Sequence, residues 1–548
     1  MLLPLALTLG TVAGLGSYYE TSDDGSLAWL FSGVMALKPV TSLPLYFHGY
    51  GHVLAAAYNA LPNWPWFGLL NAALLGLATV LIFAVLDRLL RPHLRPAMLV
   101  LALVVFFGMA WLEHWLWFSH VRVGVLLAGG AVLFAAQRPG RGAALLIGLA
   151  GLGAAWLMRP SLALLGFVAV LPAAVLLAGS IRRAAPVVLG AALGLALAAG
   201  AAALLQTPTE ARTQARDRYF ARVLDFDQLC PQPRTPADSL GTAALSLWLM
   251  GDSTVVNEAL CQRAYAFSAR EFFAQQVPAK IMVRVGQMVR DYFPLLLALA
   301  ATAWGMVRYR RQRPMFWLVQ LGFVAALGLC AGFLKLPPRL ALPLLDFWLL
   351  TNLAFVFSAQ ERSVGLSSTA SVLFPNLPRA LRLLGLVVGL VVVLIYGAKT
   401  LHRRQVLGQE ERRHRLALQA IAQARAGRIL ILAGSNDLLK SLSPFRSYSL
   451  GPGPVLVLTG WQSHDASQSQ LRRALSGTAD QTECLRRLAT SAQPGLAPVW
   501  VLTPETAAWL SRRFRFDGPR MQLSPTFGLA LPTESTLRFY RVQPWPAR

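Results

Sequence analysis

The sequence predicts a polytopic α-helical membrane protein with about 11 transmembrane helices and a C-terminal soluble α/β domain. Three observations predict this class. The chain of 548 residues is 55% hydrophobic, with a mean hydropathy of +0.50. Only 14% of it is charged, whereas a soluble domain carries about 25%. The long apolar runs stop near residue 400, so we expect a transmembrane domain over 1–400 and a separate domain over 401–548.

Apolar runs near the length of a membrane span, about 20 residues, recur along the first domain. They are rich in Ala and Gly, which lets helices pack closely in lipid. The expected spans are 2–18, 65–86, 96–112, 121–137, 142–158, 160–179, 184–205, 291–307, 315–334, 338–358 and 381–398.

The net charge of +25 does not indicate nucleic-acid binding, because most Arg and Lys lie in short loops between apolar runs. One set of alternate short loops is the richer in Arg and Lys, and that set is expected in the cytoplasm. Loops 19–64 and 206–290 and the tail after 399 then lie outside. This topology predicts a multi-pass membrane protein with its C-terminal domain on the outer side of the membrane.

Three acids lie directly after the first span, in Tyr19-Glu20-Thr21-Ser22-Asp23-Asp24-Gly25. Ionisable groups at membrane depth are costly and usually functional. A carboxylate here can act as a general base, and we place Asp24 slightly ahead of Asp23 as the catalytic residue. The alternative is that one of them caps the helix expected over 25–37.

Other ionisable residues share the outer face and are expected to bind a sugar or a lipid phosphate, since Arg and Lys hold phosphate and its developing charge. Arg159 and Arg339 could instead bind phospholipid head groups. The expected substrate-binding residues are Arg159, Lys335, Arg339, His48, His52, Glu113, His114 and Asp252.

A divalent cation is an open question. His48 and His52 are four residues apart on one amphipathic stretch, 47–61, so they share a helix face. With Asp23 and Asp24 they are the candidate metal ligands, and the alternative is two ordinary packed histidines. The stretches 25–37 and 47–61 are too short to span and are expected along the membrane surface, over the site.

The long outer loop carries Cys230 and Cys261, which could pair in an oxidising compartment or remain free thiols. In the tail, strand-length apolar runs alternate with helical stretches, which predicts a small α/β sandwich with a parallel sheet. The expected strands are 428–434, 455–459 and 499–503, and the expected helices are 468–477, 480–492 and 505–513.

An acidic first outer loop, two surface helices and a multi-span core resemble the GT-C glycosyltransferases. More narrowly, Ser22-Asp23-Asp24, Pro65-Trp66-Phe67-Gly68 and Lys335-Leu336-Pro337-Pro338-Arg339 resemble a bacterial group with an Asn-Asp-Asp loop and a Pro-Trp-Tyr-Gly motif. Ser22 replaces the Asn and Phe67 the Tyr. The resemblance covers about residues 1–400, and its motifs are short.

The resemblance implies inverting transfer of a sugar from a polyprenyl-phosphate donor to a cell-envelope glycan, lipid or protein. It also implies that Asp23 or Asp24 is the base or a metal ligand. Two other functions stay open, a transporter or flippase and a polymerase of a lipid-linked glycan. A non-catalytic scaffold is a further alternative. Asp346, inside an expected span, is the residue that tests transport.

Overall fold

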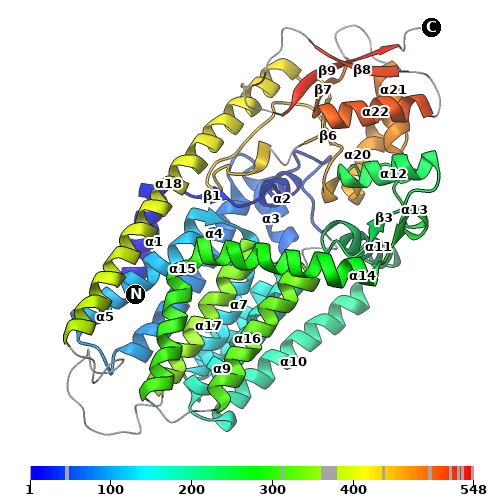
Figure 1. The fold of residues 1–548 in the computed structure, drawn as a ribbon. Coiled ribbons are helices and arrows are strands. Elements are labelled where there is room, and N and C mark those ends of the chain that lie inside the picture. Colours follow the sequence, from blue (N-terminus) through cyan, green and yellow to red (C-terminus); the bar gives the residue numbers. More distant parts are fainter. Residues whose placement is uncertain are drawn as a thin grey trace.

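The computed structural model describes residues 2–43, 49–309, 314–358, 379–434, 438–490, 497–516, 521–526, 531 and 536–544, and the structural statements below concern these residues. The chain is mostly helical, in agreement with the predicted class. A bundle of long helices forms one end of the molecule, and a layer of short helices and a β-sheet covers the other end (Figure 1).

Every expected span falls on a helix, but only six described helices are long and apolar enough to cross a membrane by length and composition. These six are α4 (Trp66–Leu90), Pro96–Leu116, α9 (Pro160–Ala178), α10 (Ile181–Leu205), α16 (Pro314–Phe333) and α17 (Pro338–Ser358). The second comprises α5 (Pro96–Phe106), the π-helical turn η1 (Phe107–Trp111) and α6 (Leu112–Leu116). Shorter apolar helices are α1 (Leu2–Leu15), α7 (His120–Ala136) and α8 (Gly142–Met158).

Helix α7 lies at the centre of the bundle and is buried on all sides. Its neighbours approach closely because small residues face them. A Cβ on Gly129 would lie 2.2 Å from the ring of Phe347 on α17, and one on Gly166 of α9 would lie 2.5 Å from the Val125 carbonyl oxygen. Such contacts replace the hydrophobic effect as the source of helix association in lipid.

Two helices extend beyond the bundle. Helix α15 (Val277–Tyr309) bends at Tyr292, two residues before Pro294. Proline has no backbone N–H, so one helical hydrogen bond is lost there. The first half of α15 runs across the bundle end and its second half descends into it (Figure 1). Helix α18 (Arg379–Arg425) joins the last expected span to the charged stretch after it in one helix of 47 residues, about 70 Å long.

Short elements cover the same end of the bundle as the sheet (Figure 1). All but β2, which lies between α6 and α7, come from the two expected outer loops. They are β1 (Tyr18–Tyr19), α2 (Ser22–Ser32), α3 (Tyr50–Ala60), β2 (Trp117–Phe118), α11 (Pro208–Leu224), β3 (Cys230–Pro231), α12 (Pro236–Ser246), α13 (Glu258–Ala264), β4 (Tyr265–Ala266), α14 (Ala269–Glu271) and η2 (Phe272–Gln276). Cys230 and Cys261 are both free thiols in this layer.

The C-terminal sheet has the strand order β6-β5-β7-β9-β8. Its parallel strands coincide with the three predicted ones, and β9 and β8 are antiparallel additions that the sequence analysis missed. Polar residues and terminal prolines interrupt the apolar pattern of both. The elements are β5 (Leu430–Leu432), β6 (Val455–Val457), η4 (Trp461–His464), α20 (Ala466–Ser476), α21 (Gln481–Thr490), β7 (Val499–Leu502), α22 (Pro504–Phe516), β8 (Met521–Pro525) and β9 (Arg538–Pro544).

Successive side chains of the sheet enter two different cores, because neighbours along a strand point to opposite faces. Leu430 and Leu432 join the core that continues into the bundle. Ile431, between them, joins a second core formed with the helices of the long outer loop. The sheet is therefore packed on both faces, which explains why its central strands are continuous apolar runs.

Candidate functional site

A two-residue ladder brings the acidic first loop against the start of α7. Strand β1 pairs with β2 in parallel, with Tyr18 opposite Trp117 and Tyr19 opposite Phe118. The C-terminal chain extends this ladder: Tyr19 donates its N–H to the Leu442 carbonyl at 2.9 Å. The acids after β1 consequently lie beside the residues after β2.

Asp24 is fully buried and bound by protein donors. His120 donates its backbone N–H to Oδ1 of Asp24 at 2.9 Å, and its ring Nδ1 lies 2.7 Å from the same oxygen. The Thr21 hydroxyl donates to Oδ2 at 3.2 Å. His120 is the first residue of α7, so the carboxylate lies where the helix dipole favours an anion.

Asp23 is the more accessible of the two acids, with 36% of its side chain exposed. Arg339, at the N-terminal end of α17, donates to Oδ2 at 3.3 Å. Trp461, in the turn after β6, donates its indole N–H to Oδ1 at 3.2 Å. Three distant parts of the chain thus meet at this carboxylate, which remains open to solvent.

A buried chain of polar groups begins at Glu20 and passes into the bundle. Arg122 donates its Nε–H to Glu20 at 2.8 Å and approaches Nδ1 of His114 at 3.4 Å. Nε2 of His114 lies 2.8 Å from Asp346 of α17. Since a guanidinium only donates, Nδ1 of His114 accepts and Nε2 carries the hydrogen that Asp346 receives.

A second group of charges joins α6 to α15 and α18. Arg403 donates to Glu113 at 2.7 Å and to Asp291 at 3.2 Å. Tyr396 donates its hydroxyl hydrogen to Glu113 at 3.0 Å, and Lys399 lies 3.3 Å from Asp291. These contacts fix the long helix α18 against the end of the bundle that the short elements and the sheet cover.

The structure gathers some of the predicted site residues and separates others. Asp23, Asp24 and Arg339 meet at the first loop, and Glu113 and His114 lie in the adjoining buried charges. Lys335 is bound to Asp225 at 2.6 Å. Arg159 lies between α8 and α9 and donates its Nε–H to the Ser161 hydroxyl at 3.2 Å.

The remaining predicted residues lie apart from this cluster. His52 is on the exposed face of α3, and His48 lies outside the described residues. Asp252 is fully buried between the long outer loop and the C-terminal helices. It accepts hydrogen bonds from Thr254, Thr482 and Arg513.

Protein donors already bind the carboxylates of both acids. Both oxygens of Asp24 receive hydrogen bonds, and those of Asp23 are met by an indole N–H and a guanidinium. A metal ion needs lone pairs that point at it, and a guanidinium in the same place repels it. The described residues hold no group of three His, Cys, Asp or Glu suited to a metal ion.

The first of the two expected surface helices, α2, does not lie at a surface. Helix α2 is largely buried, because the chain from 438 to 450 covers it: a Cβ on Gly25 would lie 2.8 Å from Cβ of Leu439. Trp29 of α2 donates its indole N–H to the Tyr448 carbonyl. The tail, rather than α2, therefore covers the first loop.

Tyrosines line the inner side of the first loop and stay protonated. Burial raises the pKa of Tyr19 well above its ordinary value. Burial also raises the pKa of Tyr58 to about 12, although the Phe67 backbone N–H donates to its hydroxyl oxygen at 3.1 Å. Neither phenol can serve as a base near neutral pH.

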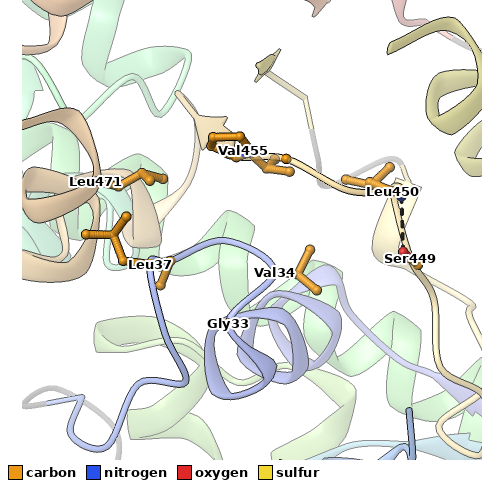
Figure 2. Close-up of a pocket in the computed structure, with 11 residues that line it drawn as sticks. Gly33, Val34, Leu37, Ser449, Leu450, Val455 and Leu471 are labelled. Carbon is orange, nitrogen blue, oxygen red and sulfur yellow. Dashed lines mark hydrogen bonds between the residues drawn. The ribbon is translucent and has the colours of Figure 1, made fainter. Parts of the chain in front are cut away.

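A cavity of about 300 Å³ lies at the far end of α2 (Figure 2). Gly33, Val34 and Leu37 form one side of it, and Leu450 and Val455 form the other. None of its lining residues is ionisable. The length of α2 separates it from Asp23 by about 15 Å, so this cavity is distinct from the cluster of ionisable groups around Asp23.

Sequence analysis assigned no role to several residues of the cluster. His120 and Arg122 were visible as polar residues at a span end. Asp291, Lys399 and Arg403 flank apolar runs, and that position was the available signal.

Trp461 carried no sequence signal, because its contact with Asp23 depends on how the tail docks. No family model, curated protein or solved structure matches this chain.

Proposed function

We propose that this protein transfers a sugar from a polyprenyl-phosphate donor to a cell-envelope acceptor, as a GT-C-type glycosyltransferase. The observation that carries the proposal is the Asp23 carboxylate, partly exposed and flanked by the guanidinium of Arg339 and the indole of Trp461. An accessible carboxylate beside a cation, at the head-group end of a helix bundle, suits displacement at a lipid phosphate.

Asp23 is the better base of the two acids under this proposal, which changes the order inferred from sequence. A base must reach the proton it removes, directly or through one water. Asp23 has part of its side chain in solvent, whereas Asp24 is fully buried. Asp24 is a positioning residue that fixes the first loop to His120 at the start of α7.

The proposed reaction is a single inverting displacement. Asp23 takes the proton from the acceptor hydroxyl while the oxygen of that hydroxyl forms a bond to the anomeric carbon. The bond from that carbon to the phosphate oxygen breaks on the opposite face, and the electron pair leaves with polyprenyl phosphate. Arg339, at the end of α17, donates to the Asp23 carboxylate and orients the base.

The proposed location is the outer face of a bacterial cytoplasmic membrane, with the sheet in the periplasm. The Arg- and Lys-rich short loops support this orientation through the positive-inside rule. The donor, the acceptor and bilayer lipids are the proposed partners. Asp23 and Asp24 as arranged argue against a metal-dependent step.

Turnover by variants of the first loop tests the proposal. Purified wild type, Asp23→Asn and Asp24→Asn receive radiolabelled polyprenyl-phosphate sugars with membrane extract as acceptor, with and without EDTA. Asp227→Asn is the matched control, because Asp227 is 62% exposed and bound to Lys280 on the same face. We expect Asp23→Asn to lose at least about 100-fold in rate, as general bases contribute 10²–10⁴-fold.

The outcomes separate the roles. Equal transfer by wild type and Asp23→Asn contradicts the assignment of the base. A lower transfer rate for Asp24→Asn, together with a lower melting temperature, is the result expected of a positioning residue. Loss of transfer in EDTA, restored by Mg²⁺ or Mn²⁺, contradicts the metal-independent step.

One observation favours transport or flipping of a lipid-linked glycan as a second candidate. The paired His114 and Asp346 lie inside the bundle, and Oδ1 of Asp346 and Nη2 of Arg122 are buried without a hydrogen-bond partner. Ionisable groups inside membrane proteins often carry protons or substrates. Asp346→Asn in proteoliposomes tests this: loss of flipping with unchanged transfer supports transport, and unchanged flipping removes it.

A further inference from the structure

We infer that a second cavity, between the long outer loop and helices α21 and α22, binds a neutral carbohydrate unit. The cavity measures about 520 Å³, within the range of about 300–1,000 Å³ usual for ligand pockets. Helices α12 and α13 form one side of it and the C-terminal helices the other. It is lined by Arg486, Asp480 and Phe516, among others.

Unsatisfied polar groups concentrate at this cavity. Nε and Nη2 of Arg486 and Oδ2 of Asp480, two of the lining residues, are buried with no hydrogen-bond partner. Buried polar atoms are nearly always paired, so a cluster of unpaired ones needs an explanation. Arg486 as a whole is only half-buried, so rotation of its terminal torsions brings its N–H groups to a ligand.

The charge at the cavity favours a neutral ligand over an anion. Arg263 holds Asp238 through two contacts of 2.7 Å, and Arg513 is bound to the buried Asp252 at 3.1 Å. Two of the three guanidinium charges are thereby compensated. Arg486 and Asp480 remain, with one charge of each sign, and Asp480 would repel a phosphate or carboxylate placed beside it.

Sugar hydroxyls match these groups. A hydroxyl both donates and accepts, so neighbouring hydroxyls can receive from the guanidinium of Arg486 and donate to the carboxylate of Asp480. Phe516 adds an exposed ring at the cavity, 51% accessible, whose face suits the C–H side of a pyranose. Polar side chains beside one aromatic platform are what a short glycan needs.

This inference does not rest on the proposed catalytic role. The cavity lies on α12, α13, α21 and α22 and shares no lining residue with the Asp23 cluster. A protein with no transferase activity could still bind a glycan there, and a transferase could lack this binding.

Glycan binding by the full-length protein in nanodiscs tests the inference. The wild type is applied to an array of neutral and acidic bacterial glycans, and the best neutral oligosaccharide is then titrated by calorimetry. Inorganic phosphate is titrated in parallel. The variants are Arg486→Ala and Phe516→Ala, with Arg487→Ala as matched control, because Arg487 follows on the same helix and pairs with Glu483 in solvent.

We expect at least a tenfold loss of affinity for Arg486→Ala and Phe516→Ala and less than a twofold loss for Arg487→Ala. Absence of binding to any neutral glycan overturns the inference. So does binding that Phe516→Ala leaves unchanged, since this exposed ring can be removed without unfolding the domain. Binding of phosphate or acidic glycans alone replaces it with an anion site.

Discussion

Trp461 donates its indole N–H to the carboxylate of Asp23 at 3.2 Å, across 438 residues of sequence. The donor lies at the start of η4, after β6, and the acceptor lies in the first turn of α2. The environment of Asp23 is therefore complete only when the C-terminal sheet is docked. A fragment that ends after the last expected span lacks one of the two donors.

Replacing this donor tests whether the sheet participates in the proposed reaction. Trp461→Phe keeps an aromatic ring and removes the N–H. A hydrogen bond to a charged group contributes about 1.5–3 kcal/mol, so we expect the transfer rate to fall about tenfold or more with unchanged folding. Initial rates measure this. Trp64→Phe, at an exposed ring, is the control and should change the transfer rate little.

His120 secures Asp24 with two donors, one from the backbone and one from the ring. His120→Leu removes the ring donor and leaves the buried carboxylate under-bonded, which should lower the melting temperature in detergent by several degrees. His120→Asn can place an amide N–H near the position of Nδ1 and should recover part of the loss. Equal melting temperatures for the two variants would contradict a hydrogen-bonding role for the ring.

The buried pair of Asp252 and Arg513 connects the long outer loop to α22. Breaking one partner leaves a buried charge, so Asp252→Asn should cost about 3–5 kcal/mol and expose the loop to trypsin. The double variant Asp252→Asn/Arg513→Gln should be cleaved by trypsin more slowly than the single variant. Limited proteolysis reads this out, with Asp227→Asn as the exposed control. Identical cleavage of wild type and Asp252→Asn would show that the pair does not secure the loop.

Asp238 should make part of the stability depend on pH. The hydrogen bond from Arg263 lowers the pKa of Asp238, with further contributions from Thr235 and the Arg234 backbone. The folded state thus favours the carboxylate. Its contribution is present above the unfolded pKa, about 3.9, and is lost as pH falls through the lower folded value.

Melting curves of Asp238→Asn between pH 6 and pH 3 check this sign. Asn keeps an oxygen that can accept from the start of α12. The melting temperature of the wild type should exceed that of the variant at pH 6, and this difference should shrink toward pH 3. A difference that grows on acidification would contradict the direction.

The bundle was predictable because apolar runs report membrane helices locally. Each run is read from about 20 consecutive residues, with no knowledge of its neighbours. The three parallel strands were predictable for the same reason, since burial on both faces makes them continuous apolar segments. The short helix α7 shows the limit of this rule: protein surrounds it, so it does not need the full span length.

The partners within the site were not predictable from local patterns. Two acids in Ser22-Asp23-Asp24 are equivalent by sequence, yet Asp24 is buried against His120 and Asp23 stays open. The distinction depends on the β1–β2 ladder and on the tail that covers α2. Strand β9 was not predicted either, because its own strand pattern is weak and its pairing with β7 is a contact between distant parts of the chain.

Helix α18 connects the helix bundle to the C-terminal sheet as one continuous helix. It is one uninterrupted helix of 47 residues, about 70 Å long, with its charged contacts to Glu113 and Asp291 near the middle. A rotation of about 5° around those contacts swings the sheet end by roughly 3 Å, the length of one hydrogen bond. Helix tilt responds to bilayer thickness, so under the proposed topology the thickness of the surrounding lipid would act on the contact between Trp461 and Asp23.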